Sequence, residues 1–302
     1  MLNEIIYNDI EKYSNEIGIE KELLVQAFKI ENYYHGLLIK EKSFEKREIL
    51  YSKFYHELLS FYGRVSKKDN SLIDKINLKN RQINLFYKEL FNKSIIDFGC
   101  GEGHFLMNIH NNIKHKKLLG IDIFIPDSLK TNKSIQFISS SIINFKSNDK
   151  YDVGFSDNVL EHLSVLDYPN HFNSIYRSLK PGGKLIILMP NRLFGPADIT
   201  RIIDNSSSGK TSAMGGHLNE STYTEIIKFL KKAGFKNFKT VLPIPKIKHY
   251  KFLKNIRLGT KWIRIIENNN SLLKLFRSVK VKGRCPVRFS ITIVCQKPSV
   301  LR

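Results

Sequence analysis

The fold is decided by Ser94-Ile-Ile-Asp97-Phe-Gly99-Cys-Gly101-Glu-Gly103-His-Phe105. In this stretch an apolar run ends in an aspartate, and three glycines then alternate with other residues. Glycine suits positions where the backbone takes a positive φ or approaches a ligand without an obstructing Cβ atom. The pattern predicts a strand that turns sharply into a helix, whose first backbone amides suit the polar end of a nucleotide-like ligand. Its D-x-G-x-G-x-G spacing is neither G-x-G-x-x-G nor a P-loop.

Short apolar runs alternate with helical segments after this stretch. Such alternation predicts an α/β fold, with parallel strands joined by right-handed crossovers and covered by helices. Ligands of these sheets bind at the carboxyl ends of the strands, where the glycine turn lies. The predicted strands are Ile95–Phe98, Leu118–Ile123, Ile135–Ser139, Tyr151–Ser156, Lys184–Met189, Phe238–Leu242 and 287–295.

The first 93 residues have a different texture, because they contain no proline and their apolar residues recur at helical spacing. We expect residues 1–93 to form a helical cap, for substrate binding or dimerisation, before a larger domain over 94–302. The chain of 302 residues has no apolar run near the roughly 18 residues of a membrane span. Its N-terminus lacks a signal-peptide pattern, so a cytoplasmic location is expected. Three cysteines without C-x-x-C spacing predict free thiols and no zinc cluster.

The formal charge of +21 is concentrated near the C-terminus, where Glu267 is the only acid between Lys246 and Arg302. Lysine greatly outnumbers arginine, and asparagine and isoleucine are abundant, which compositional bias alone could produce. The segment 244–286 reads as a basic insertion that mixes aromatic and apolar residues with the charges. Three interpretations are open: it packs on the sheet edge, it contacts an anionic membrane surface through residues 246–288, or it binds an anionic acceptor.

Polar residues follow the second, third and fourth predicted strands. Asp122 ends the second strand about 20 residues after the glycine turn, at the step where a dinucleotide fold places an acid for ribose hydroxyls. Asn158, Glu161 and His162 follow the fourth strand at helical spacing, so they are expected to share a helix face. Leu179-Lys-Pro-Gly-Gly183 then predicts a tight turn into the fifth strand.

Four segments together resemble the successive motifs of class I S-adenosylmethionine-dependent methyltransferases: IIDFGCGEGHF, GIDI, YDVGFSDNVLEHL and LKPGGKLIILMPN. The match spans about Ser94 to Met189. The resemblance implies a Rossmann-like, mostly parallel sheet of seven strands with helices on both faces, whose last strand is antiparallel. It also implies S-adenosyl-L-methionine as the cofactor. A nicotinamide-dependent dehydrogenase is disfavoured by the glycine spacing.

The resemblance assigns cofactor-binding roles to particular residues of this chain. The acid after the second strand, Asp122, would bind the ribose. Many members have an acid at the end of the third strand that meets the adenine amino group, whereas this chain has Ser141 there, which suggests recognition by a backbone amide such as that of Ile142. Ser156, at the end of the fourth strand, is the remaining candidate. The methionine side would be formed by Asp97, Gly99, Cys100, Gly101 and Gly103.

The acceptor side is less defined. The layout P-N-R, loop, G-H-L, helix, A-G-F is similar to a branch that includes the ubiquinone-pathway O-methyltransferases and many small-molecule and sugar methyltransferases. It implies a flap over about 191–220 and O-methylation of a small molecule or saccharide, which could be lipid- or phosphate-linked. Removal of a hydroxyl proton needs a base, and the candidates are His162 and His217.

Two further questions concern metals and nucleic acids. In the ubiquinone-pathway enzymes two acids and the histidine of this motif are associated with a divalent metal. This chain keeps Glu161 and His162 but has Asn158 in place of the first acid, so no metal site is predicted. The chain also lacks the Asn/Asp-Pro-Pro-Tyr/Phe motif of base methyltransferases. RNA ribose methylation, or cofactor binding without catalysis, remain the alternative functions.

Overall fold

The computed structural model describes residues 6–65, 72–242, 253–278 and 290–299. The chain divides into two compact units. Unit 1 contains residues 1–69, 160–166 and 190–222, and unit 2 contains residues 70–159, 167–189 and 223–302. The segment 191–220, predicted to be a flap, therefore groups with the first N-terminal helices, whereas the later N-terminal helices, between residues 72 and 90, group with the sheet.

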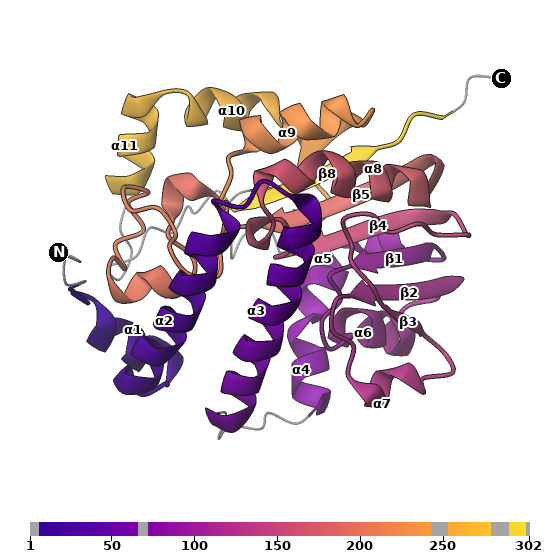
Figure 1. Cartoon of the computed structure of the whole chain (residues 1–302). Helices are drawn as coiled ribbons and strands as arrows, with labels where there is room; N and C mark the ends of the chain where they lie inside the picture. The colour runs from indigo at the N-terminus through magenta and orange to yellow at the C-terminus, as the bar shows by residue number, and fades with distance from the viewer. Residues whose placement is uncertain (1–5, 66–71, 243–252, 279–289, 300–302) are drawn as a thin grey trace. The chain divides into compact units, whose positions relative to one another are not determined.

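Unit 2 contains one eight-stranded sheet in the order β3-β2-β1-β4-β5-β8-β6-β7. Figure 1 shows the first five of these strands side by side in that order. They pair in parallel, and β8 is antiparallel to β5 and β6. The strands are β1 (Ser94–Phe98), β2 (Lys117–Asp122), β3 (Gln136–Ser139), β4 (Tyr151–Asp157), β5 (Leu179–Met189), β6 (Lys236–Thr240), β7 (Leu258–Gly259) and β8 (Ile291–Gln296).

The predicted Rossmann-like, mostly parallel sheet is confirmed, with one strand more than expected. The additional strand is β7, a two-residue pairing with β6 inside the predicted basic insertion. The turn predicted over Leu179–Gly183 lies inside β5 and not before it, because this strand pairs with β4 at Leu179 and again from Lys184, with a register shift between Tyr151 and Val153. Gly182 has φ 77° there, and its N–H donates to the carbonyl oxygen of Lys297 at 3.0 Å.

Helices cover both faces of the sheet, because alternate side chains along each strand are buried on opposite sides. On one face α5 (Asn80–Leu90) and α6 (His104–Asn112) form a core with β1 and β4, in which Phe105 stacks on Phe155 at 3.8 Å. On the other face α8 (Tyr168–Ser178) packs on β4 and β5 and contacts α9 (Tyr223–Lys232). Two further short helices of unit 2 are α4 (Leu72–Leu78) and α7 (Asp127–Lys130).

Unit 1 is helical. It contains α1 (Ile10–Ile17), α2 (Lys21–Leu38) and α3 (Phe44–Val65), together with short 3-10 turns at Leu160–His162, Val165–Asp167, Arg192–Phe194 and Ile199–Ile202, of which the second extends into unit 2. A buried cluster joins α2, α3 and the last of these turns, and its members are Leu24, Ala27, Phe28, Phe61, Ile199 and Ile202. The apolar spacing of the N-terminal region thus forms a helical core, as predicted for this part of the chain.

The described part of the basic insertion packs within unit 2. Its helices are α10 (Lys261–Glu267) and α11 (Asn270–Ser278), which bury Ile263 and Leu273. Glu267 accepts hydrogen bonds from the backbone N–H groups of Tyr223 and Thr224 at 2.9 and 3.2 Å, at the start of α9. The one acid of the basic region therefore supports a helix N-terminus. Contact of residues 246–288 with an anionic membrane stays a prediction, and many of these residues lie outside the described ranges.

Within the described residues, no helix is both long enough and apolar enough to cross a membrane.

Asp152 at the start of β4 supplies a test of acid stability. Partial burial would raise its pKa, but hydrogen bonds from Ser94 and Lys180 lower the pKa to about 2. A folded-state pKa below the unfolded value gives stability that is present above pH ~4 and lost as the pH falls toward ~2. Solvent screens the partly exposed Lys180, so we expect ionised Asp152 to contribute about 1–2 kcal/mol to the free energy of unfolding at neutral pH.

In Asp152→Asn, urea denaturation at neutral pH should show this loss, and the difference from wild type should shrink at pH ~2. Asp127→Asn is the control, because the Asp127 side chain is exposed and its replacement should leave the free energy of unfolding close to that of wild type. A constant difference between wild type and Asp152→Asn across this pH range would contradict the assignment.

Candidate functional site

The turn between β1 and α6 has the backbone that its glycines predict. Gly99, Gly101 and Gly103 have φ values of 80°, 51° and 73°, all in the left-handed region. Gly99 and Cys100 donate their N–H groups to the carbonyl oxygen of Ile121 on β2, at 2.8 and 3.0 Å. These bonds tie the turn to the carboxyl end of the neighbouring strand.

A cavity of about 260 Å³ opens at this turn, at the carboxyl ends of β1 and β4. Parallel sheets usually bind ligands at this edge. Of the residues predicted to hold the methionine side, all except Gly103 line it. The complete lining is Lys79, Asp97, Gly99, Cys100, Gly101, Glu102, His104, Phe105, Phe155 and Asp157.

The two acids of the predicted cofactor site lie next to the turn. Asp97 is buried, and burial together with the nearby Asp157 carboxylate holds its pKa well above the usual value. Asp122 accepts hydrogen bonds from the N–H groups of Gly101 at 2.8 Å and Phe124 at 3.2 Å. Burial raises the pKa of Asp122 as well. The acid predicted to bind ribose is thus attached to the glycine turn itself.

The remaining cofactor candidates do not line this cavity. Ser156 is buried on β4 and alternates with Phe155 and Asp157, so it faces the opposite side of the sheet. The loop after β3 carries Ser141 and Ile142. The Ile142 carbonyl oxygen is held at 3.0 Å by Nδ1 of His171 from α8. Their assignment to the adenine end stays a prediction.

Sequence reasoning missed several polar residues at the cavity. Asp157 follows Ser156 at the end of β4, and its Oδ2 atom accepts hydrogen bonds from Lys79 at 3.0 Å and Gln82 at 2.6 Å. The position of Asp157 after a parallel strand was a usable signal. Lys79 precedes Asp157 by 78 residues, so no local pattern could connect them.

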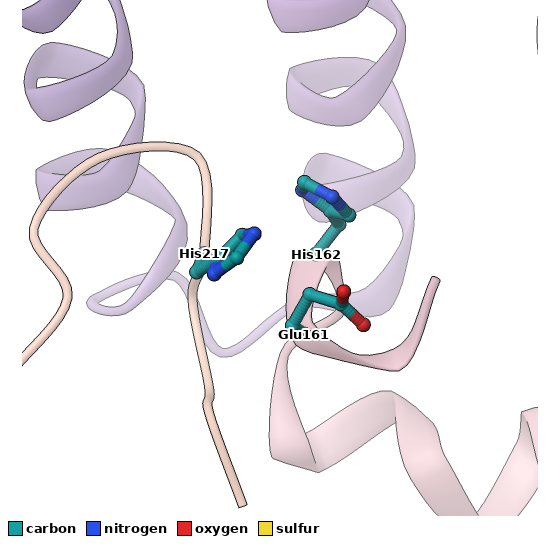
Figure 2. Close-up of side chains that lie close together, drawn as sticks. All are labelled: Glu161, His162 and His217. Carbon is teal, nitrogen blue, oxygen red and sulfur yellow. The ribbon is translucent and has the colours of Figure 1, made fainter. Parts of the chain in front are cut away.

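A second cluster of polar side chains lies within unit 1. Potential ligand atoms of Glu161, His162 and His217 all lie within 4.8 Å of one another. Figure 2 shows His217 on its loop, beside the turn that carries Glu161 and His162. The predicted helix face from Asn158 to His162 is wrong: Asn158 has φ 54° and the helical part is only the 3-10 turn Leu160–His162. Asparagine tolerates this left-handed conformation better than most residues.

Backbone hydrogen bonds hold the loop that carries His217. Asp198 accepts from the N–H groups of Gly215 at 2.9 Å and His217 at 3.3 Å. Between them, Gly216 donates to Glu31 at 2.6 Å. Burial raises the pKa of Glu31 to about 7. Three successive amides are therefore bound by two buried carboxylates.

The loop is also attached to the turn before it in sequence. The N–H groups of Leu218 and Asn219 donate to the carbonyl oxygen of Glu161, at 2.7 and 3.0 Å. These bonds bring the two histidine rings to a centroid distance of 4.9 Å, nearly perpendicular to one another. The structure thus brings together the two histidines that the sequence proposed separately.

Each imidazole is fixed through Nδ1. Nδ1 of His162 lies 3.0 Å from the carbonyl oxygen of Gly216, and Nδ1 of His217 lies 2.7 Å from Oε1 of Glu220. Burial, with the neighbouring His217, lowers the pKa of His162 to about 3. Burial would lower the pKa of His217 too, but the hydrogen bond to Glu220 and the charge of Glu161 raise it overall.

The family comparison agrees with the topology. Residues 48–240 match a family model described as a methyltransferase domain. No curated protein sequence matches the chain.

Solved structures of low sequence identity resemble this one. A SAM-dependent methyltransferase from Archaeoglobus fulgidus is 19% identical over 80% of this chain and 100% of that chain, with a TM-score of 0.48. The 1,6-didemethyltoxoflavin-N1-methyltransferase of Burkholderia thailandensis is 13% identical over 84% of this chain and 90% of that one, with a TM-score of 0.48. A phosphoethanolamine N-methyltransferase of Haemonchus contortus is 16% identical, with a TM-score of 0.46 over 73% of this chain and 53% of its own.

Proposed function

Because the chain belongs to the methyltransferase-domain family, we propose that it transfers a methyl group from S-adenosyl-L-methionine to an oxygen of a small molecule or saccharide. The observation that carries this proposal is the cavity at the glycine turn, with Asp122 bonded to Gly101 beside it. The backbone amides of the glycine turn and the acids Asp97 and Asp122 beside it suit the charged methionine end and the ribose of this cofactor.

Direct methyl transfer needs little chemistry from the protein. The acceptor oxygen, the methyl carbon and the sulfur must lie in line, and the acceptor must lose its proton. We assign removal of the proton to the pair His162 and His217. The geometry supports this choice, since both Nδ1 atoms are held by oxygen acceptors, so that Nε2 of each ring carries a lone pair whenever the ring is neutral.

Incubation of a cell extract with the protein and methyl-labelled cofactor tests the function. Label should appear in the small-molecule or saccharide fraction when lipid, saccharide, RNA, protein and small-molecule fractions are separated. If the acceptor is a lipid-linked saccharide, the label should appear in the lipid fraction, and mild hydrolysis should release the labelled saccharide from the lipid. Label confined to RNA or protein would overturn the proposed acceptor class. Cofactor binding without any labelled product would favour the non-catalytic alternative.

The assignment of the histidines has its own test. We expect His162→Ala and His217→Ala to lower methyl transfer to a purified acceptor by roughly 10²–10⁴-fold, the usual contribution of a positioned proton acceptor. Their affinity for S-adenosylmethionine should stay within about twofold of wild type. The exposed His110 provides the control variant, His110→Ala. If the double variant His162→Ala with His217→Ala retained full transfer, the assignment would fail.

A further inference from the structure

We propose that Glu161, His162 and His217 bind a divalent transition-metal ion, with Zn²⁺ as the best-suited probe. The three ligand groups lie within 4.8 Å of one another (Figure 2). In a tetrahedral zinc site, ligand atoms are roughly 3.4 Å apart, which follows from metal–ligand distances near 2.0–2.1 Å. The cluster needs to contract by roughly an ångström to reach that geometry.

The hydrogen bonds of the imidazoles favour this role. A carbonyl or carboxylate oxygen can only accept, so Nδ1 of each ring carries a proton, and in the neutral ring, which is the form that binds a metal, Nε2 carries the lone pair. The acceptors are the carbonyl of Gly216 for His162 and the carboxylate of Glu220 for His217. Metal-binding histidines usually have their second nitrogen held by such oxygens, which fixes the tautomer and the ring.

The buried carboxylates around His217 also favour a bound cation. Four carboxylates are buried in this part of unit 1: Glu31, Glu161, Asp198 and Glu220. Glu161, Asp198 and Glu220 all act electrostatically on His217. Buried charge is costly unless it is compensated, and a divalent cation would compensate it at the centre of the group.

The donor set selects the class of cation. Two imidazoles and one carboxylate suit zinc and other late first-row metals, whereas Mg²⁺ and Ca²⁺ prefer oxygen ligands. Sequence reasoning predicted no metal site because it considered only the residues around Glu161. The third ligand, His217, lies on the loop 203–222, far along the chain from them. This inference goes beyond the proposed function, because cation binding does not require methyl transfer. If the proposed function holds, imidazoles that coordinate the cation cannot also take the acceptor proton, and the cation would promote its loss by lowering the pKa of a coordinated hydroxyl group.

Equilibrium dialysis of the full chain against Zn²⁺, followed by elemental analysis, tests the site. We expect one Zn²⁺ per chain that millimolar Mg²⁺ does not displace. Glu161→Gln, His162→Ala and His217→Ala should each weaken binding by more than the roughly 10–100-fold that loss of an outer-shell partner costs. His110→Ala should bind as wild type. No Zn²⁺ on the wild type, or equal binding by the ligand variants, would overturn the inference.

A Co²⁺ spectrum of the wild type keeps the inference testable if a variant fails to fold. Nitrogen and oxygen ligands should give visible d–d bands without a thiolate charge-transfer band. A thiolate band would assign the cation to a cysteine and reject this site. Zn²⁺ binding without any methyl transfer would overturn the proposed function alone. Methyl transfer by a chain that binds no Zn²⁺ would overturn the metal site alone.

Discussion

Gly101→Val should abolish the response of the protein to S-adenosylmethionine while leaving the fold intact. Gly101 has φ 51°, and a Cβ atom added there meets no heavy atom within 4 Å. A β-branched residue in this conformation is strained by about 1–3 kcal/mol. Its side chain would also point from the lining of the cavity into space that the ligand needs. We expect affinity to fall at least roughly a hundredfold, about 2.7 kcal/mol.

Thermal unfolding with and without the cofactor measures this effect, because a ligand that binds only the folded state raises Tm. The wild type should show the rise and Gly101→Val should not. Gly259→Val is the matched control in the same unit, since Gly259 lies in β7 with open space around its Cβ position. A Gly101→Val protein that is stabilised by the cofactor as strongly as wild type would show that the turn does not contact it.

Glu89→Ala should destabilise unit 2 by about 3–5 kcal/mol, because it leaves a buried guanidinium without its carboxylate. Both oxygens of Glu89 accept from Arg257, at 3.1 and 2.9 Å, and both side chains are about nine-tenths buried. Arg257 also donates to the carbonyl oxygens of Leu85 and Lys254. Those bonds remain in the variant, so the lower end of the range is expected.

Urea denaturation gives the free energy of unfolding for this test. The double variant Glu89→Leu with Arg257→Leu should recover most of the loss, since apolar residues can replace a buried ion pair with little cost. Glu11→Ala is the control, because Glu11 and Lys21 form an exposed pair at 3.4 Å. If the free energy of unfolding of Glu89→Ala lies within about 0.5 kcal/mol of the wild-type value, the ion pair with Arg257 does not stabilise the fold as proposed.

The ion pair also bears on the charge of the chain. Arg257 lies in the basic region, which sequence alone connected with packing, a membrane or an anionic acceptor. In the structure it is bound to α5, and Glu267 is bound to the start of α9. Packing therefore explains these two residues.

The parts of the fold that sequence predicts are those that depend on neighbouring residues. The glycine turn was predicted because positive φ values and an apolar strand leave a local pattern. Strand β7 was not, because two residues within a charged segment carry no periodicity. The prediction of a helix face at Asn158 was wrong because a local pattern was present but insufficient: the spacing of polar residues alone does not establish a helix.

The site follows the same division. Asp97 and the glycines were identified from their motif, and all but Gly103 line the cavity. Lys79 and Gln82 reach Asp157 from a helical region 75–78 residues away, which no motif records. The two histidines were named separately, 55 positions apart, and hydrogen bonds of the loop to Glu161 and His162 bring them together.

The most direct test of the methyltransferase assignment is calorimetric titration of the wild-type chain with S-adenosyl-L-methionine. We expect saturable binding of one cofactor molecule per chain, with S-adenosylhomocysteine competing for the same site. Absence of saturable binding by a folded wild-type protein would contradict the account at its centre.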